Sequence, residues 1–233
     1  MMGFNRIALW AAIILTFIFI PVSEAANFVS REQVDLVRLL GPPPADQSPQ
    51  TRTEILELLQ LQQIATPKDR DAAAADDRIS VFQFASSILG PRFTVANLPL
   101  TEELFRRLSK DAISLFVESK DQWNRTRPAR INGEIKPCSD HASSGAYPSG
   151  HSTCGYLTAI VLAEMLPEKK PEIFERAGQY ARNRMVCGVH YRSDIEAGQI
   201  AGTVIAAFAM QNPRFRKDFE EARKEVRTLL GLP

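Results

Sequence analysis

The sequence is poor in histidine and cysteine, with only three residues of each among 233. The cysteines, Cys138, Cys154 and Cys187, have no spacing that is typical of a zinc site, so the sequence predicts no metal centre. The chain also has almost no net charge, because 28 Lys and Arg nearly balance 27 Asp and Glu and leave a formal charge of +1. A nearly neutral chain argues against nucleic acid as the main partner.

Two further patterns are absent. No segment shows sustained alternation of apolar and polar residues, which argues against β-strands, and no internal repeat is present. Apolar residues instead recur at helical spacing between Gly and Pro residues, and we predict an all-α, single-domain protein. The expected helices cover residues 32–40, 51–66, 71–89, 101–128, 151–166, 170–210 (as one helix or a broken pair) and 215–230. The apolar stretch 200–210 is too short to span a bilayer and is expected to be a core helix.

Residues 1–25 have the pattern of a secretory signal peptide. Arg6 precedes an apolar run over residues 7–22, and small residues at Ser23 and Ala25 suit cleavage after Ala25. The alternatives are an uncleaved membrane anchor, for which the run is short, and a lipoprotein signal, which the lack of a following cysteine excludes. We therefore expect a domain over residues 26–233 that is periplasmic or secreted, with no stable membrane association after cleavage.

The second half of the chain carries basic residues and two of the three histidines at fixed intervals. The pattern is K-x6-R-P starting at Lys120, then P-S-G-H starting at Pro148, then R-x5-H-x3-D starting at Arg184. Phosphoryl transfer without a metal needs a cationic clamp, a nucleophile and a proton donor, and this set of residues contains all three.

The first two motifs also have ordinary structural interpretations. Lys120 and Arg127 are two helical turns apart, so both can project from one helix face toward a phosphate, although isolated pairs of this kind are commonly solvated charges. Ser149 and Gly150 lie where a loop becomes a helix. Such a junction forms a simple capped turn, or presents free N–H groups to an anion, or does both.

The third motif combines Arg184, His190 and Asp194. His190 and Asp194 are at i and i+4, which places a carboxylate beside an imidazole. An isolated pair at this spacing is commonly a solvated ion pair. Together with the other motifs, it predicts that Asp194 accepts from one ring nitrogen and directs the other at phosphorus. Arg184 is expected to add bidentate contacts to the phosphoryl oxygens.

This order and spacing of motifs resembles the superfamily of acid phosphatases, type 2 phosphatidic acid phosphatases and vanadium haloperoxidases. Within it the resemblance is to the class A bacterial non-specific acid phosphatases. Residues 145–152 (GAYPSGHS) resemble their loop signature, and residues 187–190 (CGVH) resemble the segment that ends in their nucleophile. The resemblance implies a helical bundle of the acid phosphatase/vanadium haloperoxidase type that needs no cofactor, hydrolyses phosphate monoesters and forms a homo-oligomer.

The resemblance also implies a role for each motif residue. His190 is the nucleophile that forms a phosphohistidine, His151 is first the acid and then the base, and Asp194 orients His190. Contacts to phosphate are implied for the five remaining residues, Lys120, Arg127, Ser149, Gly150 and Arg184. Since one histidine must be neutral while the other keeps its proton, we expect both to titrate near the working pH, with an acidic optimum. An alcohol in place of water gives phosphotransferase activity.

Other functions use the same residues. A vanadium-dependent haloperoxidase holds vanadate in the same clamp, although the short chain and the GAYPSGHS loop favour a phosphatase. A phosphate- or phospholipid-binding protein with little turnover is disfavoured by the complete set of His151, His190 and Asp194. A membrane-bound lipid phosphatase needs several spanning helices, which residues 26–233 lack. The natural substrate is not readable from the sequence.

Some residues near the motifs depart from the pattern or lie outside it. Asn183 stands where the resembling family usually has serine before the arginine, which leaves the role of that side chain open. His141 matches no motif position, and we expect it to be non-catalytic. Three aromatic residues beside the motifs are candidates for pocket walls or for core packing, namely Trp123, Tyr147 and Tyr191.

Export into an oxidising compartment predicts one disulfide and one free thiol among the three cysteines. If the motifs converge, Cys138 and Cys187 come close together, so we predict that this pair is bridged. Cys154 follows His151 inside the next helix and is expected to be a buried thiol. The odd count leaves an intermolecular bridge as the alternative.

Overall fold

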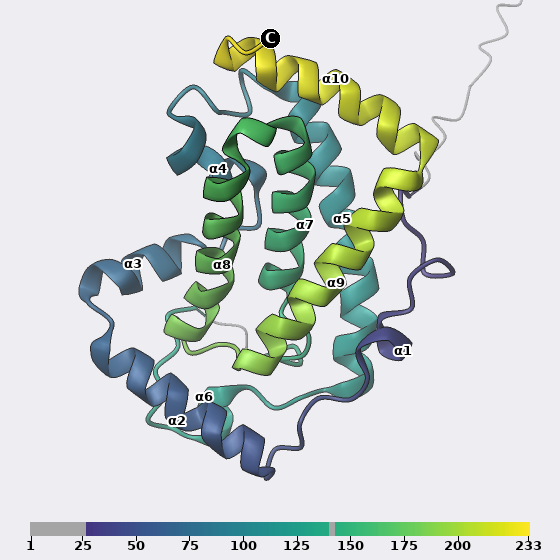
Figure 1. The fold of residues 1–233 in the computed structure, drawn as a ribbon. Helices are drawn as coiled ribbons and strands as arrows, with labels where there is room; N and C mark the ends of the chain where they lie inside the picture. Colours follow the sequence, from purple (N-terminus) through teal and green to yellow (C-terminus); the bar gives the residue numbers. More distant parts are fainter. Residues whose placement is uncertain (1–26, 140–142) are drawn as a thin grey trace, which may run out of the picture.

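The computed structural model describes residues 27–139 and 143–233, and every regular element in these ranges is helical (Figure 1). The helices are α1 (Leu36–Leu40), α2 (Pro49–Ile64), α3 (Pro67–Ala75), α4 (Val81–Leu89), α5 (Pro99–Trp123), α6 (Pro128–Ile131), α7 (Gly150–Met165), η1 (Pro167–Lys169), α8 (Lys170–Val186), α9 (Arg192–Gln211) and α10 (Pro213–Leu230). The all-α prediction is confirmed for this part of the chain. The signal peptide predicted for residues 1–25 lies outside the described residues.

Prolines and short polar side chains fix where several helices begin. Ser48 and Thr66 accept hydrogen bonds from N–H groups in the first turns of α2 and α3, and Pro49 and Pro67 follow them at the first helical position. A helix is predicted over residues 51–66, just before Pro67, whereas α2 ends at Ile64 and Pro67 begins α3. Pro67 therefore marks the start of α3 and not the end of α2.

The single helix predicted over residues 71–89 is wrong, because this stretch forms two helices, α3 and α4, with a turn at residues 76–80. The hydroxyl of Ser80 accepts a hydrogen bond from the Phe82 N–H and caps α4. Asp76, directly after α3, is buried and pairs with Arg176 of α8, which holds the turn against that helix. Apolar periodicity carries no information about this polar contact, since the partner lies 100 residues further along.

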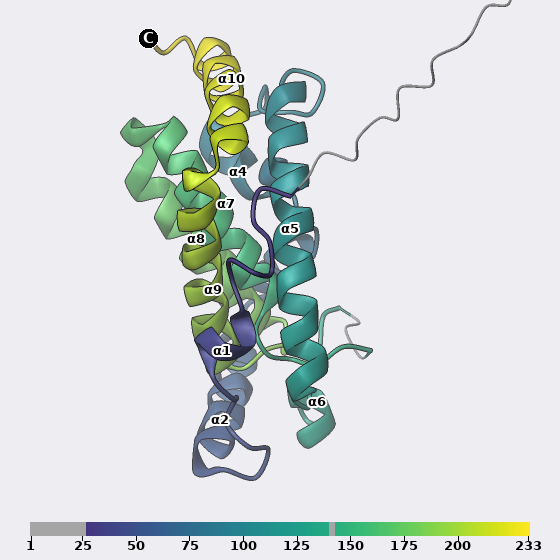
Figure 2. The same cartoon turned by 90° about the vertical axis from the view of Figure 1, so that its right-hand side faces the viewer.

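The core is centred on α7, which packs against α8 and α9, while α5 runs alongside and α10 crosses one end (Figure 2). Glycines bring α9 close to α7: a Cβ at Gly198 would lie 2.6 Å from the Ser149 carbonyl oxygen, and one at Gly202 would clash with the Thr153 carbonyl. The predicted core helix at residues 200–210 belongs to this interface. Four of its side chains are fully buried, namely Ala201, Ile205, Ala206 and Ala209. Among the described helices, none is long and apolar enough to cross a membrane.

Four helix ends meet at the end of the molecule opposite α10, where α5 and α8 finish and α7 and α9 begin (Figure 1). Helix α5 stops at Trp123 because Asn124 adopts a left-handed conformation, with φ 38°. Arg127 then caps α6 in an extended conformation. Lys120 and Arg127 therefore do not share a helix face, contrary to the prediction from their spacing. They approach the same end of the molecule from a helix and from a loop.

Candidate active site

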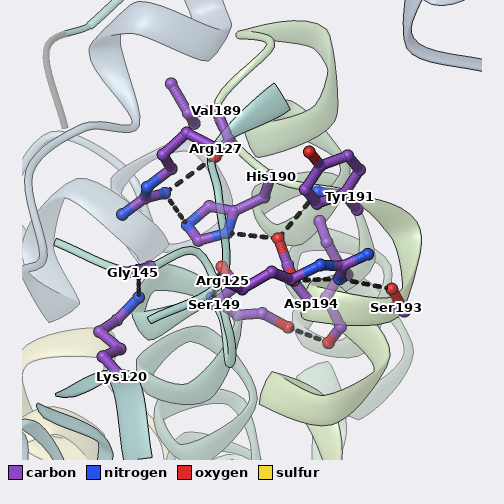
Figure 3. A network of polar contacts seen from close by, with 12 residues as sticks. Lys120, Arg125, Arg127, Gly145, Ser149, Val189, His190, Tyr191, Ser193 and Asp194 are labelled. Atoms are coloured by element: carbon purple, nitrogen blue, oxygen red, sulfur yellow. Dashed lines mark hydrogen bonds and ion pairs between the residues drawn. The ribbon is translucent and has the colours of Figure 1, made fainter. Parts of the chain in front are cut away.

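His190 is held in one orientation by Asp194. His190 precedes α9 and Asp194 lies in its first turn, with 3.1 Å between Nδ1 of the imidazole and Oδ2 of the carboxylate (Figure 3). On the other side of the ring, Nε2 lies 3.0 Å from Nη1 of Arg127. A carboxylate accepts and a guanidinium donates, so Nδ1 carries the proton and Nε2 presents a lone pair.

Lys120 and Arg127 approach adjacent residues of one loop. Lys120 Nζ donates to the carbonyl of Gly145 at 2.7 Å (Figure 3). Arg127 Nε donates to the carbonyl of Ser144 at 3.0 Å. Both side chains are buried. Burial, reinforced by the charge of Arg127, lowers the pKa of Lys120 to about 7. An anion that entered beside these two groups would therefore favour the charged form of Lys120.

The Ser149–Gly150 junction forms the start of α7, beside Asp194. The Ser149 N–H donates to the backbone carbonyl of Asp194 at 2.9 Å, and its hydroxyl accepts from the Ser152 N–H at 3.3 Å. A Cβ at Gly150 would lie 2.7 Å from the ring of Phe116, so packing against α5 also requires a glycine here. These contacts fix a helix N-terminus, which favours anions, next to the orienting carboxylate.

His151 and Arg184 meet at Asp77, in the turn after α3. His151 Nε2 lies 2.9 Å from the carbonyl oxygen of Asp77, and because a carbonyl only accepts, Nε2 carries a proton. Arg184 Nη1 donates to Oδ1 of Asp77 at 2.9 Å, and its Nη2 donates to the carbonyl of Ala73. Nε of Arg184 is buried without a hydrogen-bond partner among the described residues. None of the sequence motifs includes a residue of this turn.

Cationic groups from three motifs act together on His190. Burial lowers the pKa of His190 well below its ordinary value of 6.5, and the charges of Arg127, Lys120, His151 and Arg184 lower it further. The structure therefore brings the three motifs into one electrostatic site. This lowered pKa favours the neutral form of His190. The expectation that both histidines titrate near the working pH stays a prediction.

Arg125 is a residue of this site that the motifs do not identify. Its Nη1 lies 2.5 Å from Oδ1 of Asp194 and 2.7 Å from the hydroxyl of Ser193, and its Nη2 lies 2.9 Å from Oε2 of Glu54. Glu54 accepts in turn from the Ser193 N–H at the start of α9. The guanidinium stacks 4.0 Å from the centre of the Tyr191 ring, which is fully buried. The sequence indicates Arg125 only as a further arginine just after α5. Its partner Glu54 lies on α2, far away in the sequence, so their pairing is not visible there.

The cysteines behave as predicted. Cys138 and Cys187 form a disulfide with their Cα atoms 4.9 Å apart, and the Cys138 N–H donates to the carbonyl of Cys187 at 3.0 Å. The bridge ties the loop before α7 to the end of α8, just ahead of His190. Cys154 is free and buried, and burial raises the pKa of its thiol to about 12, so it is an unreactive thiol.

The remaining residues singled out in the sequence lie around the site or outside the described ranges. Asn183 donates from Nδ2 to Oδ2 of Asp76 at 2.7 Å. Trp123 and Tyr147 pack edge to face, with 5.1 Å between ring centroids. His141 lies outside the described residues. Within them, no three or more His, Cys, Asp or Glu side chains form a group that could hold a metal ion.

Comparison with known proteins identifies the family. Over 201 residues the chain is 30% identical to the acid phosphatase of Zymomonas mobilis subsp. mobilis, an alignment that covers 82% of this chain and 75% of that protein. Residues 108–218, which contain all eight predicted site residues, match the family described as the PAP2 superfamily. The chain belongs to the PAP2 superfamily.

Other relatives agree with this assignment. A non-specific acid phosphatase of Salmonella typhimurium is 29% identical over 203 residues, covering 84% of this chain and 81% of that protein. The relatives over most of the chain are thus acid phosphatases, which places this PAP2 member among the enzymes of the superfamily.

A solved structure shares the fold. The first bacterial vanadium-dependent iodoperoxidase matches with a TM-score of 0.57 and 21% identity. The match covers 73% of this chain but only 52% of the iodoperoxidase, so this PAP2 member spans about half of that protein. At this identity the likeness concerns the fold alone, and it confirms the predicted bundle of the acid phosphatase/vanadium haloperoxidase type.

Proposed function

We propose that this protein hydrolyses phosphate monoesters without a metal ion, by way of a phosphohistidine formed on Nε2 of His190. The observation that carries the proposal is the pair of contacts on the His190 ring. The Asp194 carboxylate at Nδ1 assigns the proton to that nitrogen, so the lone pair is on Nε2, where Arg127 holds it until the substrate binds. A nucleophile, an orienting carboxylate and a cationic clamp together are what phosphoryl transfer requires.

In the first step, Nε2 of His190 attacks phosphorus in line and the bond from phosphorus to the leaving oxygen breaks. His151, in its imidazolium form, gives its Nε2 proton to the leaving oxygen and becomes a neutral imidazole. Three cationic side chains and the N-terminus of α7 stabilise the charge on the equatorial oxygens of the phosphoryl group. The cations are Lys120, Arg127 and Arg184, and the helix start contributes Ser149 and Gly150.

In the second step, water attacks phosphorus while His151 takes its proton, and the phosphorus–nitrogen bond breaks. Phosphate leaves and His190 returns to its neutral form. An alcohol in place of water receives the same phosphoryl group, which gives phosphotransferase activity. The lowered pKa of His190 supports activity at acidic pH, because it favours the unprotonated nucleophile that the first step needs.

The test is turnover of p-nitrophenyl phosphate by the purified protein between about pH 4 and pH 9, with EDTA present throughout. We expect an acidic optimum and an acid-labile phosphoryl group on the wild-type protein during turnover, both lost in His190→Ala. His141→Ala, a histidine outside the motifs, is the matched control and is expected to keep wild-type turnover. Absence of turnover at every pH would contradict the proposal, and vanadate-dependent halide oxidation would then be measured.

We further propose that the mature protein comprises residues 26–233, is exported to the periplasm or secreted, and forms a homo-oligomer. The pattern of residues 1–25 and the Cys138–Cys187 disulfide support export, since disulfides persist in oxidising compartments. The oligomer rests on the family resemblance. N-terminal sequencing of the purified protein is expected to begin at Ala26, and sedimentation is expected to give more than one subunit.

A further inference from the structure

The turn after α3 covers the place where the phosphate would bind. Arg184 is fully buried, and His151 and His190 are almost fully buried. Asp77, which contacts both Arg184 and His151, has 39% of its side chain exposed. A phosphate monoester that uses Nη1 of Arg184 and the Nε2 proton of His151 must therefore displace Asp77 from both.

Asp77 occupies two positions that the substrate needs. Its carboxylate lies at Nη1 of Arg184, where an equatorial phosphoryl oxygen would bind, and its backbone carbonyl accepts the His151 proton that the leaving oxygen would take. Nε of Arg184 is buried and unpartnered, so this guanidinium has a donor left over while Asp77 holds it. A phosphate offers more acceptor oxygens than one carboxylate and can use that donor as well.

A row of side chains on α8 holds the turn in this position. Arg176, Tyr180, Asn183 and Arg184 follow helical spacing and lie along one stripe of the helix. The Asp76 carboxylate accepts hydrogen bonds from Nη1 and Nη2 of Arg176 and from Nδ2 of Asn183. The Tyr180 hydroxyl donates to the carbonyl of Arg78 at 3.0 Å.

Asn183 explains part of this arrangement. A serine at this position, as in the resembling family, would end one heavy atom closer to the backbone than Nδ2 does. Its hydroxyl would not reach the Asp76 carboxylate without movement of the turn. The departure from the family pattern therefore strengthens the attachment of the turn to α8.

We propose that Asp77 is a specificity-determining residue that the substrate phosphate displaces from Arg184 and His151, and that Asp76 and Asn183 set how readily it leaves. This inference rests on the proposed function, because it assigns the phosphate to Arg184 and the leaving oxygen to His151. Displacing a resident carboxylate weakens the binding of every phosphate ligand. It favours ligands that engage all the donors of Arg184 over simpler anions.

The test is calorimetric titration of the full protein with inorganic phosphate at a fixed pH near 6. Asp77→Ala and Asp77→Asn remove the competing charge, and we expect phosphate to bind roughly fivefold more tightly, the equivalent of about 1 kcal/mol for a partly exposed ion pair. Asn183→Ser is expected to change the affinity in the same direction by less. Asp71→Asn removes an equal charge from an exposed position on α3 and is expected to change nothing.

The outcomes separate this inference from the proposed function. Unchanged or weaker phosphate binding in both Asp77 variants, with turnover in the wild type, would overturn the role of Asp77 alone. Tighter binding without any turnover in the wild type would support the role of Asp77 and contradict the proposed reaction. No phosphate binding by any variant would overturn both. If Asp77→Ala does not fold, Asp77→Asn and Asn183→Ser decide, since the first keeps a polar side chain in the turn and the second leaves the residues of the turn unchanged.

Discussion

The guanidinium of Arg125 lies 2.5 Å from Oδ1 of Asp194, while the other oxygen of the same carboxylate accepts from His190. One buried carboxylate thus links the nucleophile to a buried cation. Glu54 binds the other terminal nitrogen, Nη2, at 2.9 Å, so two carboxylates share one arginine inside the protein. Removing a single member leaves the others uncompensated, which makes the charge of Asp194 dependent on Arg125.

We expect Arg125→Met to move the acid side of the rate profile to higher pH. Burial raises the pKa of Asp194, and the charge of Arg125 is the largest effect that opposes this rise. Without it, Asp194 takes up a proton at a higher pH and no longer holds the His190 tautomer, so kcat is lost first at low pH. Measuring kcat against pH checks the shift, and urea unfolding is expected to show a loss of roughly 3–5 kcal/mol.

Glu54→Gln is the control for this prediction. The amide keeps the shape of the side chain, and Arg125 keeps its contact with Asp194. We expect lower stability but an unchanged acid side of the profile, because the charge next to Asp194 is still present. Equal shifts in the two variants would contradict a direct effect of Arg125 on Asp194 and would point to a general loosening of the site.

The sequence predicts the parts of this site that depend on local spacing. The pairing of His190 with Asp194 follows from i,i+4 geometry, and the cap at Ser149 follows from a loop that becomes a helix. The positions of helix ends are harder to predict, because α5 stops at a left-handed asparagine, Asn124, which is a weaker end signal than glycine.

Polar contacts between distant segments outside the motifs could not be predicted. Glu54 and Arg125 are 71 residues apart, and Asp77 and Arg184 are 107 residues apart. A buried carboxylate looks the same in sequence as a solvated one, since only its partner distinguishes them, and a single sequence carries no information about that partner. The residues that orient and cover the site therefore appear only in three dimensions, while those on short motifs can be named beforehand.

Phosphate is expected to bind less tightly as the pH rises through about 7, because Lys120 loses its charge there. Burial lowers the pKa of Lys120 to about 7 in the free protein, so the lysine is charged below this pH and neutral above it. Bound phosphate favours the charged form, so binding above pH 7 is coupled to proton uptake. Calorimetry in two buffers of different ionisation enthalpy measures that uptake directly.

Lys120→Arg separates this effect from the titration of phosphate itself. Arginine stays charged throughout, and phosphate contributes equally to both proteins, so the difference between the two pH profiles reports Lys120. We expect the two affinities to diverge above pH 7 and to run parallel below it. Parallel profiles over the whole range would contradict the assignment of the titrating group to Lys120.

Removing the Cys138–Cys187 disulfide is expected to cost stability more than activity. The bridge closes a segment with a sequence separation of 49, which by loop entropy corresponds to roughly 4 kcal/mol. Without it, the Gln62 side chain still donates to the Lys136 carbonyl at 2.8 Å and accepts from the Lys136 N–H at 3.0 Å, so the loop remains attached to α2. Urea unfolding of the double Cys→Ser variant measures the loss. Cys154→Ser is the control, and reductant should destabilise this control as it does the wild type while leaving the double variant unchanged.

Gly202 and Gly178 both lie inside helices, but a methyl group would have opposite effects at the two positions. At Gly202 it would clash with the backbone carbonyl of Thr153, so α9 must move away from α7, and we expect a loss of about 1–3 kcal/mol. At Gly178 a Cβ meets no atom within 4 Å, so Gly178→Ala is expected to stabilise the protein by about 0.5–1 kcal/mol through helix propensity.

Urea unfolding of these two variants measures the change in the free energy of unfolding. Changes of the same sign in both variants would contradict the close contact of α9 with α7. Activity adds a second criterion. Helix α7 carries His151 at its start and α9 carries Asp194, so Gly202→Ala changes the distance between the proton donor and the residue that orients the nucleophile. Because Gly202 lies a full two turns beyond Asp194, it cannot touch the substrate. A fall of kcat in Gly202→Ala at temperatures where the protein is fully folded, without a similar fall in Gly178→Ala, would therefore measure how strictly phosphoryl transfer depends on the spacing of α7 and α9.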